Sequence, residues 1–484
     1  MEGSWEVHPA DWPRAQALGR AIGVHRITAH LVLNRGVREA SAARRFLSPD
    51  AAALADPLAL PDMARAVSRL RRAIAQREAI LIFGDSDVDG LTATAILYEV
   101  LRSLGAQVRA RLSNRIEDGY GLAWSVVAQA CRTAIGLVVL VDCGTNQAAE
   151  VRRLAAHGID TIIIDHHLPL EEVAAPLAFV NPHRARDVGR ELCSAGLALK
   201  VAQALLDGTA EGVSAYFDVA ALGTLADYAP LVGESRLIAA KGLPRILHSL
   251  RPGLARLCEA TKTRDAVPEQ IVRRLVPRLN ALGRLGDPTA GWRLLLEADD
   301  ARIEEWLLEA QEAHVTTKRL ARRLIGEAEE QVSRLHFRDQ FVLVVSRSGW
   351  PQGLMGPLAS RLASRYGRPT LAVALDGARG TGSGRSIPLF NLLEAVQTCQ
   401  ELLVRFGGHA QACGFTVNLK NLEPFRTRLN AQVQRTLGRE GLRSRRMLDL
   451  ELPLRALQPD WIRECERLAP FGPGNPRPLV LFHG

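Results

Sequence analysis

Lysine is scarce in this chain, although the chain is basic. Among 484 residues, 61 are lysine or arginine and 52 are acidic, which gives a formal net charge of +9, yet only five of the 61 are lysine. Arginine binds phosphate through two parallel hydrogen bonds, whereas lysine acts as a point charge. The arginine excess therefore indicates either a GC-rich genome or selection for an anionic partner, and composition leaves both interpretations open.

Several classes of protein are excluded by what else is missing. Aromatic residues make up only 5%, but hydrophobic residues reach 47%, too many for a wholly disordered chain. The seven cysteines form no Cys-x-x-Cys pair, which argues against a disulfide framework and fits a reducing compartment. No run of about 18 apolar residues is present, and residues 1–6 lack the basic start and apolar core of a signal peptide. We therefore expect a soluble, cytoplasmic protein without a membrane partner.

From residue 79 onward, apolar runs of strand length alternate with amphipathic helical patterns. The first three runs are Ala79–Phe83, Leu137–Val141 and Thr161–Ile164. Uniformly apolar strands that alternate with helices are typical of a parallel sheet covered on both faces. The sequence thus predicts an α/β fold with a parallel-sheet lobe over residues 79–245, preceded by a helical segment with proline breaks over residues 1–78.

A second, smaller α/β lobe is predicted over residues 336–446. Its expected strands and helix are Phe341–Val345, Thr370–Leu375, Cys413–Leu419 and, for the helix, Leu354–Tyr366. Residues 246–335 are interpreted as a helical connector, because Ala301–Leu335 is long, charged and almost free of helix breakers. The arginines between residues 426 and 446 indicate a solvated helix face or, alternatively, a surface that binds a phosphate backbone.

Acidic residues gather where three of these strands end. Gly84-Asp85-Ser86-Asp87-Val88-Asp89-Gly90 follows the first strand directly, and Asp142 and Asp165-His166-His167 follow the next two. The carboxyl ends of parallel strands meet in one crevice of an open sheet. Three carboxylates at alternate positions would repel one another unless a cation lay among them. A calcium loop of the EF-hand type does not fit, because Ile96 stands where that loop needs its last glutamate.

The mixture of oxygen ligands and imidazole favours Mg²⁺ or Mn²⁺ over structural zinc. A lone aspartate at a strand end is often only a helix N-cap, but three successive strand ends are harder to explain in that way. Carboxylates shared by two ions form the clamp that enzymes use for in-line hydrolysis of phosphodiesters. The crevice is therefore predicted to be a two-metal hydrolytic site.

These three motifs resemble those of the DHH phosphoesterases, and further segments resemble the RecJ family of single-strand-specific 5′→3′ exonucleases within that superfamily. The further segments are Ser113–Gly121, Leu222–Asp227, Pro277–Asp287, Gly382–Ser386, Phe406–Ala410 and Pro470–Pro476. The resemblance implies a DHH catalytic domain over residues 79–245 and a DHH-associated domain over residues 336–446. It also implies a truncated OB-fold-like segment over residues 447–484.

The resemblance implies roles for particular residues as well. Two divalent ions, Mn²⁺ or Mg²⁺, would be held by Asp85, Asp87, Asp89, Asp142, His166 and Asp227. Asp142 would be the bridging, catalytic carboxylate, and His167 would face the scissile phosphate. Contacts to phosphate or nucleic acid are expected from Arg115, Arg284, Ser383, Gly384, Arg385 and His409. An ordinary surface ion pair is the alternative for each arginine, and a structural Gly-Gly-His turn is the alternative for His409.

Two positions depart from the family pattern, and the C-terminal segment is short. Ser86 stands where an aromatic residue is usual, and Pro351 follows Trp350 where the family typically has histidine. Residues 447–484 are too few for a five-stranded OB barrel, so we expect weak grip on long single strands. The apolar run Leu479–Phe482 is expected to be an exposed end that frays or self-associates.

The predicted function is hydrolysis of single-stranded DNA from the 5′ end to mononucleotides, in DNA recombination and repair. By resemblance, the partners are single-stranded DNA, a helicase and a single-strand-binding protein, and the chain acts as a monomer. Two alternatives remain, a DHH-type phosphodiesterase of short oligonucleotides or cyclic dinucleotides and a non-catalytic nucleic-acid-binding paralogue. The Pro277–Asp287 segment argues against the first alternative, and the complete set of ligand residues argues against the second.

Overall fold

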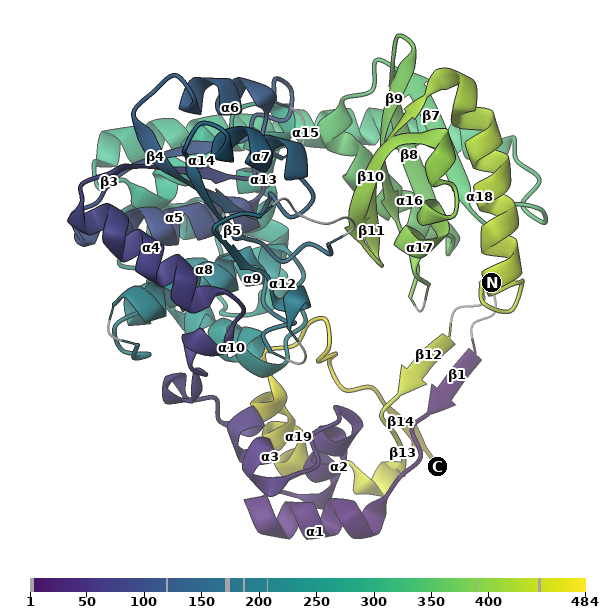
Figure 1. The fold of residues 1–484 in the computed structure, drawn as a ribbon. Coiled ribbons are helices and arrows are strands. Elements are labelled where there is room, and N and C mark those ends of the chain that lie inside the picture. The colour runs from purple at the N-terminus through teal and green to yellow at the C-terminus, as the bar shows by residue number, and fades with distance from the viewer. Residues whose placement is uncertain are drawn as a thin grey trace.

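The computed structural model describes residues 4–118, 121–169, 175–185, 188–206, 208–388, 390–442 and 445–484. Gly119 and Tyr120 of the Ser113–Gly121 motif and Arg443 of the arginine-rich segment lie outside the described residues. Two α/β lobes lie side by side, and a third part, formed by segments near both ends of the chain, lies below them in Figure 1. Within the described residues, no helix combines the length and the hydropathy needed to cross a bilayer.

The first lobe is built on a five-stranded parallel sheet with the strand order β3-β2-β4-β5-β6. Alternate residues of strand β4 face opposite layers: Val139 packs in the core shared with α5 and α8, whereas Val138 and Leu140 pack with residues of α6 and α7. The predicted parallel sheet, covered on both faces, is therefore confirmed. Its strands and helices are β2 (Ala79–Gly84), β3 (Gln107–Leu112), β4 (Ile135–Val141), β5 (Asp160–Ile164), β6 (Ala178–Val180), α4 (Met63–Ala75), α5 (Val88–Ser103), α6 (Trp124–Ala130), α7 (Ala148–Ala155), α8 (Ser194–Leu205) and α9 (Phe217–Ala226).

The apolar pattern does not predict the two edge strands of this sheet. Strand β3 alternates apolar side chains with arginines and is half-exposed, and β6 has only three residues. Both lie at the outer positions of the strand order, where one side of the ladder has no neighbour. The exposed positions of β3 weaken its hydrophobic signal, whereas β6 is fully buried but too short to stand out as an apolar run.

The second lobe holds a mixed five-stranded sheet in the order β10-β11-β9-β8-β7. The pair β7–β8 is parallel, and the other three pairs are antiparallel. Three of the strands and the helix near Leu354–Tyr366 match the prediction, but β9 and β10 do not appear in it. The elements are β7 (Leu343–Ser348), β8 (Thr370–Asp376), β9 (Arg379–Arg385), β10 (Leu403–His409), β11 (Ala412–Asn418), α16 (Met355–Tyr366), α17 (Leu392–Gln397) and α18 (Leu422–Leu437).

Strands β9 and β10 contain glycines, which have a low strand propensity, so the sequence pattern does not reveal these strands. Gly382 of β9 lies against the ring of Phe415, and any side chain there would collide with that ring. Glycine is thus required by close packing inside a strand, where it is otherwise unfavourable. The alternative of a structural Gly-Gly-His turn does not match the structure, because His409 is the last residue of β10 and pairs with Ala412 of β11.

The connector between the lobes is helical, as predicted. Its longest helix, α15 (Asp300–Ser333), runs behind both lobes and matches the segment Ala301–Leu335 to within two residues (Figure 1). A π-helical turn, η5 (Ile271–Leu275), leads directly into α13, which packs along α15. The remaining connector helices are α11 (Pro252–Ala260), α12 (Pro268–Gln270), α13 (Val276–Leu285) and α14 (Thr289–Leu296), and they follow α10 (Gly233–Leu247), which packs on α9 of the first lobe.

The third part joins segments from near both ends of the chain, which a purely helical N-terminal segment does not anticipate. Strand β1 pairs in parallel with β12, and helices α1 to α3 share one core with β13, α19 and β14. The expected exposed end at Leu479–Phe482 is wrong for Val480 and Phe482, which pack against this core as β14 pairs with β13, whereas Leu479 is 43% exposed. These elements are β1 (Ser4–Val7), α1 (Trp12–Ile22), α2 (Arg26–Asn34), α3 (Ala40–Leu47), β12 (Arg445–Leu448), β13 (Leu450–Pro453), α19 (Pro459–Cys465) and β14 (Val480–His483).

Arg236 of α10 ties the third part to the first lobe. Its buried guanidinium donates hydrogen bonds to the carbonyl oxygens of Phe46 (3.0 Å), Ala469 (2.7 Å) and Pro470 (3.2 Å). By contrast, Arg426 and Arg428 of α18 pair with Glu423 and Glu401 at the surface. That pairing favours the solvated helix face over a backbone-binding patch for this part of the arginine-rich segment.

Candidate active site

The loop between β2 and α5 carries Asp85, Asp87 and Asp89 at the carboxyl end of the sheet. Asp87 caps α5, because its Oδ1 accepts hydrogen bonds from the backbone N–H groups of Asp89 (3.0 Å) and Gly90 (3.2 Å). Gly90 packs so closely on the backbone of Asp85 that a side chain there would collide with it. The loop is therefore tight, and it places three carboxylates within a single turn.

Asp89 and Asp142 both meet the N-terminus of helix α8. The two carboxylate oxygens of Asp89 accept hydrogen bonds from the backbone N–H groups of Ser194 and Ala195, at 2.8 Å each. Asp142 ends β4 in a left-handed conformation (φ 60°), which is uncommon for a residue other than glycine and clusters at functional sites. Its Oδ1 accepts a hydrogen bond from the hydroxyl of Ser194 (2.9 Å). One helix end thus aligns two of the predicted ligands.

The histidine pair after β5 points in two directions. His166 turns towards the carboxylates, with Nε2 3.3 Å from Asp142 and 3.7 Å from Asp89, and with Nδ1 3.9 Å from Asp227. Burial and the neighbouring His167 lower the pKa of His166 to about 4, so the ring is in the neutral form that binds metal. His167 instead contacts Asp165, which holds its Nδ1 at 2.7 Å.

The structure brings all six predicted metal residues together in two adjoining groups. Asp85, Asp87 and Asp142 form one group, and Asp89, His166 and Asp227 form the other, with the ligand atoms of each group within 4.8 Å of one another. Asp142 of the first group is also the nearest contact of His166 in the second.

Electrostatics test whether this donor set fits a cation. Burial and nearby carboxylates raise the pKa of Asp87, and they raise the pKa values of Asp142 and Asp227 well above the ordinary range. Burial would also raise the pKa of Asp85, but Arg115 and Ser113 outweigh it and lower that pKa. At neutral pH the ionised carboxylates of this set repel one another. Divalent cations that prefer oxygen ligands would offset that repulsion. The residues therefore fit two such ions.

Arg115 and Ser86 form part of the carboxylate site itself. The guanidinium of Arg115 donates to Asp85 Oδ2 (3.0 Å) and to the hydroxyl of Ser86 (2.7 Å). Serine at position 86, where an aromatic residue was expected, thus supplies a polar partner for this arginine. Pro351 precedes the short helical turn η6 (Gln352–Leu354) and brings no polar side chain.

Arginines from three different elements converge opposite the carboxylates. Arg115 follows β3, Arg284 lies at the end of α13, and Arg385 ends β9 in the second lobe. Burial and then the charge of Arg115 lower the pKa of Arg284 to about 10, and the same two causes lower that of Arg385. Among the described residues, Arg284 and Arg385 have no ion-pair partner. Like charges gathered in this way are a site for an anion.

Ser383 and Gly384 belong to the same anion site through Arg385. The Nη1 of Arg385 donates to the Ser383 hydroxyl (2.9 Å) and to the Gly384 carbonyl (2.8 Å). These bonds fix the guanidinium at the end of β9. The structure thus assembles the predicted phosphate residues of the second lobe on one strand.

His409 reaches the histidine pair from the second lobe. Its ring stacks on His167 (centroids 4.9 Å apart) and on His166 (5.2 Å). Its Nε2 is buried and has no hydrogen-bond partner among the described residues. Burial and the two neighbouring imidazoles lower the pKa of His409 to about 2. A buried, unpaired nitrogen beside His166, a member of the second group, is placed to meet a ligand.

Sequence reasoning missed the partners that orient these groups. Asp165 accepts hydrogen bonds from the backbone N–H groups of His166 and His167 as well as from the His167 ring. Ser113 donates to Asp85 (2.7 Å), and Ser194 contacts Asp142. Asp165 could have been found from its place directly before the two histidines, whereas nothing in the local pattern marks Ser194.

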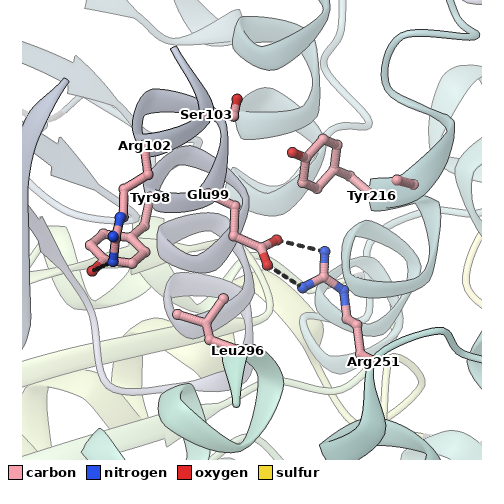
Figure 2. A pocket seen from close by; sticks show the side chains of 8 residues that line it. Tyr98, Glu99, Arg102, Ser103, Tyr216, Arg251 and Leu296 are labelled. Atoms are coloured by element: carbon pink, nitrogen blue, oxygen red, sulfur yellow. Dashed lines mark hydrogen bonds and ion pairs between the residues drawn. The ribbon is translucent and has the colours of Figure 1, made fainter. Parts of the chain in front are cut away.

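A separate pocket of about 490 Å³ lies at the other end of α5. It is lined by Tyr98, Glu99, Arg102, Ser103, Ala215, Tyr216, Arg251 and Leu296. Figure 2 shows the guanidinium of Arg251 facing the carboxylate of Glu99, with which it forms two hydrogen bonds. No predicted site residue lines this pocket, and its central charges neutralise each other. The candidate active site is therefore the carboxylate crevice at the N-terminal end of α5.

Three family models match successive parts of the chain. They are the DHH family N-terminal domain over residues 79–224, the DHHA1 domain over residues 339–435 and the RecJ OB domain over residues 448–484. Together they cover both lobes and the C-terminal segment in the order that the motifs indicate.

Curated relatives and solved structures agree with these matches. The single-stranded-DNA-specific exonuclease RecJ of Bacillus subtilis is 34% identical over 99% of this chain, and the chain spans 61% of that relative's length. The protein of the same name from Dickeya dadantii is 35% identical over 93% of this chain and 82% of its own. The crystal structure of RecJ from Thermus thermophilus in complex with Mn²⁺ has a TM-score of 0.86 at 30% identity, covering 99% of this chain and 69% of that one. The chain belongs to the RecJ family of DHH phosphoesterases.

Proposed function

We propose that this chain is a metal-dependent exonuclease that hydrolyses single-stranded DNA from the 5′ end to mononucleotides. The observation that carries the proposal is the pairing of two features across the lobes. Two adjoining groups of carboxylate and imidazole ligands lie near the buried guanidinium groups of Arg284 and Arg385, which have no ion-pair partner among the described residues. The names of the relatives, which describe single-stranded-DNA-specific exonucleases, support the same substrate class.

The metal ligands in this proposal are the six residues of the two groups. Asp85, Asp87 and Asp142 would hold one Mn²⁺ or Mg²⁺ ion, and Asp89, His166 and Asp227 would hold the other, with Asp142 shared between them. Bound ions of this kind supply positive charge for a non-bridging phosphate oxygen and lower the pKa of water. The crystal structure of the Thermus thermophilus relative with Mn²⁺ supports the choice of ion.

Other side chains would bind and orient the strand. Arg284, Arg385 and Ser383 would bind the 5′ phosphate, because bidentate arginines and a hydroxyl recognise phosphate oxygens. Asp165 holds Nδ1 of His167, and Nε2 of the same ring would face the scissile phosphate. His409 would close the site from the second lobe through its unpaired Nε2.

Degradation assays with defined substrates test the proposal. The purified chain is incubated with Mn²⁺ and with single-stranded DNA labelled at either end, duplex DNA of the same sequence, or a dinucleotide. We expect a labelled mononucleotide to appear first from the 5′-labelled single strand, slow loss of the duplex and no reaction with EDTA. Preferential cleavage of the dinucleotide would favour a small-substrate phosphodiesterase, and binding of single strands without cleavage would favour a non-catalytic relative.

We further propose that the chain works as a monomer in the cytoplasm, in recombination and repair beside a helicase and a single-strand-binding protein. Seven cysteines without a disulfide among them support a reducing compartment. Co-purification from cells and light scattering of the pure chain test these points.

A further inference from the structure

Helix α13 touches the carboxylate loop at two places from the connector. The side-chain Oδ1 of Asn280 accepts a hydrogen bond from the backbone N–H of Val88, at 3.1 Å. Three residues later, Gly283 lies so close to the carbonyl oxygen of Ser86 that a side chain there would collide with it. The two contacts bracket the loop, although Asn280 and Val88 are 192 residues apart in the sequence.

The bond from Val88 completes the N-terminal cap of α5. The first N–H groups of a helix have no partner within the helix and need acceptors from elsewhere. Oδ1 of Asp87 accepts hydrogen bonds from the N–H groups of Asp89 and Gly90. Asn280 serves Val88, whose residue is only 1% exposed, so an unpaired N–H there would be costly. Because all three N–H groups have acceptors, Oδ2 of Asp87 is not needed for the cap and lies towards Arg115, at 3.9 Å, and the ligand group.

The same helix supports the anion site and the second lobe. Arg284 follows Asn280 by one turn of α13 and belongs to the arginine cluster. Gly353 of the second lobe packs on the backbone of Arg284 so closely that a side chain would collide with it. A π-helical turn precedes α13, and such turns are frequent at functional sites. Helix α13 therefore contacts both the carboxylate loop and the second lobe, and it carries Arg284 of the arginine cluster.

We propose that Asn280 is a positioning residue for the metal groups, acting through the loop Asp85–Asp89. The proposal rests on the proposed function, since it assumes that this loop binds divalent ions. Asn280 does not touch an ion or a substrate. It fixes the first turn of α5 against α13, so that the loop carboxylates and Arg284 keep a constant spacing. Removing a residue that holds a metal ligand in place typically weakens metal binding by about 10-fold to 100-fold. Asn280 holds the backbone N–H of Val88, which lies between the predicted ligands Asp87 and Asp89.

Direct Mn²⁺ binding tests this role without relying on turnover. Calorimetric titration of the metal-free full chain is compared for the wild type, Asn280→Leu and Asn280→Asp. Leucine has a similar size and no acceptor, so we expect a Kd about 10-fold to 100-fold weaker. Aspartate keeps the acceptor, so its Kd should stay within about threefold of the wild type. Asn280→Ala, which adds no bulk, replaces the leucine variant if that variant does not fold.

Asn430→Leu is the matched control. Asn430 of α18 also accepts hydrogen bonds from backbone N–H groups, those of Phe341 (2.7 Å) and Val342 (3.2 Å), but in the second lobe away from the carboxylates. Its loss should lower the melting temperature and leave the Mn²⁺ affinity unchanged. The proposal is overturned if Asn280→Leu binds Mn²⁺ as the wild type does, or if the aspartate variant is as weak as the leucine variant. A wild type that binds no Mn²⁺ would instead overturn the proposed metal site, and the role of Asn280 with it.

Discussion

The carboxylate of Asp165 lies 2.7 Å from Nδ1 of His167, and the same oxygen accepts the backbone N–H groups of both His166 and His167. Its second oxygen accepts the N–H of Thr145. Asp165 therefore orients one histidine towards the carboxylates and the other towards the expected phosphate. It is buried at the end of β5 and belongs to neither of the two ligand groups formed by the six predicted metal residues.

The first prediction concerns Asp165→Asn. An amide keeps one acceptor oxygen, but its NH2 group would face the N–H of Thr145, donor against donor, and the negative charge beside His167 is lost, so the histidine pair is held less firmly. We expect activity on single-stranded DNA to fall about 10-fold to 100-fold, measured as mononucleotide release under saturating Mn²⁺. Asp160→Asn, at the opposite end of β5, is the control and should stay active, because Asp160 pairs with Arg69 and Arg72 away from the site. Equal activity of the two variants would refute the orienting role.

The second prediction concerns Asp142→Asn. The variant removes a carboxylate charge from the first ligand group, 3.3 Å from His166 of the second, so hydrolysis should fall by at least about 100-fold, while binding of single strands largely survives. Stability should change in the opposite sense. Burial and neighbouring carboxylates raise the pKa of Asp142 above its unfolded value, so the ionised group destabilises the metal-free fold as pH rises. Melting curves at neutral pH without metal should therefore show a higher melting temperature for Asp142→Asn than for the wild type.

Asp218→Asn separates this effect from the mere loss of a buried aspartate. Asp218 is 4% exposed and lies near Arg251, beside the pocket of Figure 2. Because it has a cationic partner, its loss should lower the melting temperature and spare hydrolysis. Near-normal turnover by Asp142→Asn would show that Asp142 is not a ligand.

The third prediction concerns metal removal. Divalent ions that bind only the folded chain stabilise it by mass action, about 2.7 kcal/mol at 100 times the Kd. Mn²⁺ should therefore raise the melting temperature, and EDTA should reverse the change. The gain should disappear in Asp142→Asn and persist in Asp218→Asn. A gain of the same size in both variants would point to binding elsewhere on the chain.

The fourth prediction concerns salt. Binding of single strands should weaken with a log–log slope of about −0.7 for each phosphate neutralised, or roughly −3 to −4 for four to six contacts. Arg284→Ala should make the slope shallower by about 0.7, measured by fluorescence anisotropy over a salt series. Arg428→Ala should leave it unchanged, because Arg428 is paired with Glu401 on the surface of α18. A wild-type slope near zero would mean that the arginine excess reflects composition only.

The fifth prediction concerns Arg236→Leu. Three carbonyl oxygens from two distant segments lose their donor, which costs about 2 kcal/mol in the free energy of opening the third part. Cleavage by thermolysin should then be about 30-fold faster, since proteolysis follows the population of the open form. Arg245→Leu is the control, because Arg245 lies on the same helix but is exposed and, among the described residues, donates only to the carbonyl oxygen of Ser214. Equal cleavage rates for both variants would show that Arg236 does not anchor the third part.

Local patterns were enough to predict the three central strands of the first sheet, β2, β4 and β5, and the place of the carboxylates that follow them. Strand β4 carries no polar side chain, so both of its faces must be buried. In a chain where strands and helices alternate, helices cover the two faces of a parallel sheet. Once the strands are parallel, their carboxyl ends must share an edge, and so Asp85, Asp142 and His166 must be neighbours. The family resemblance supplied the more distant ligand, Asp227, which no strand end marks.

Tertiary structure alone decided which distant groups complete the site. The N-terminus of α8 meets Asp89 across 105 residues, Asn280 meets Val88 across 192, and His409 enters from the other lobe. Hydrophobic periodicity reports which face of an element is buried, but it does not report which other element covers that face. A hydrogen bond between distant residues therefore leaves no trace in the local sequence, and neither does the pairing of β1 with β12. Strands β9 and β10 are hidden for a related reason, because their glycines are required by contacts that exist only in the folded chain.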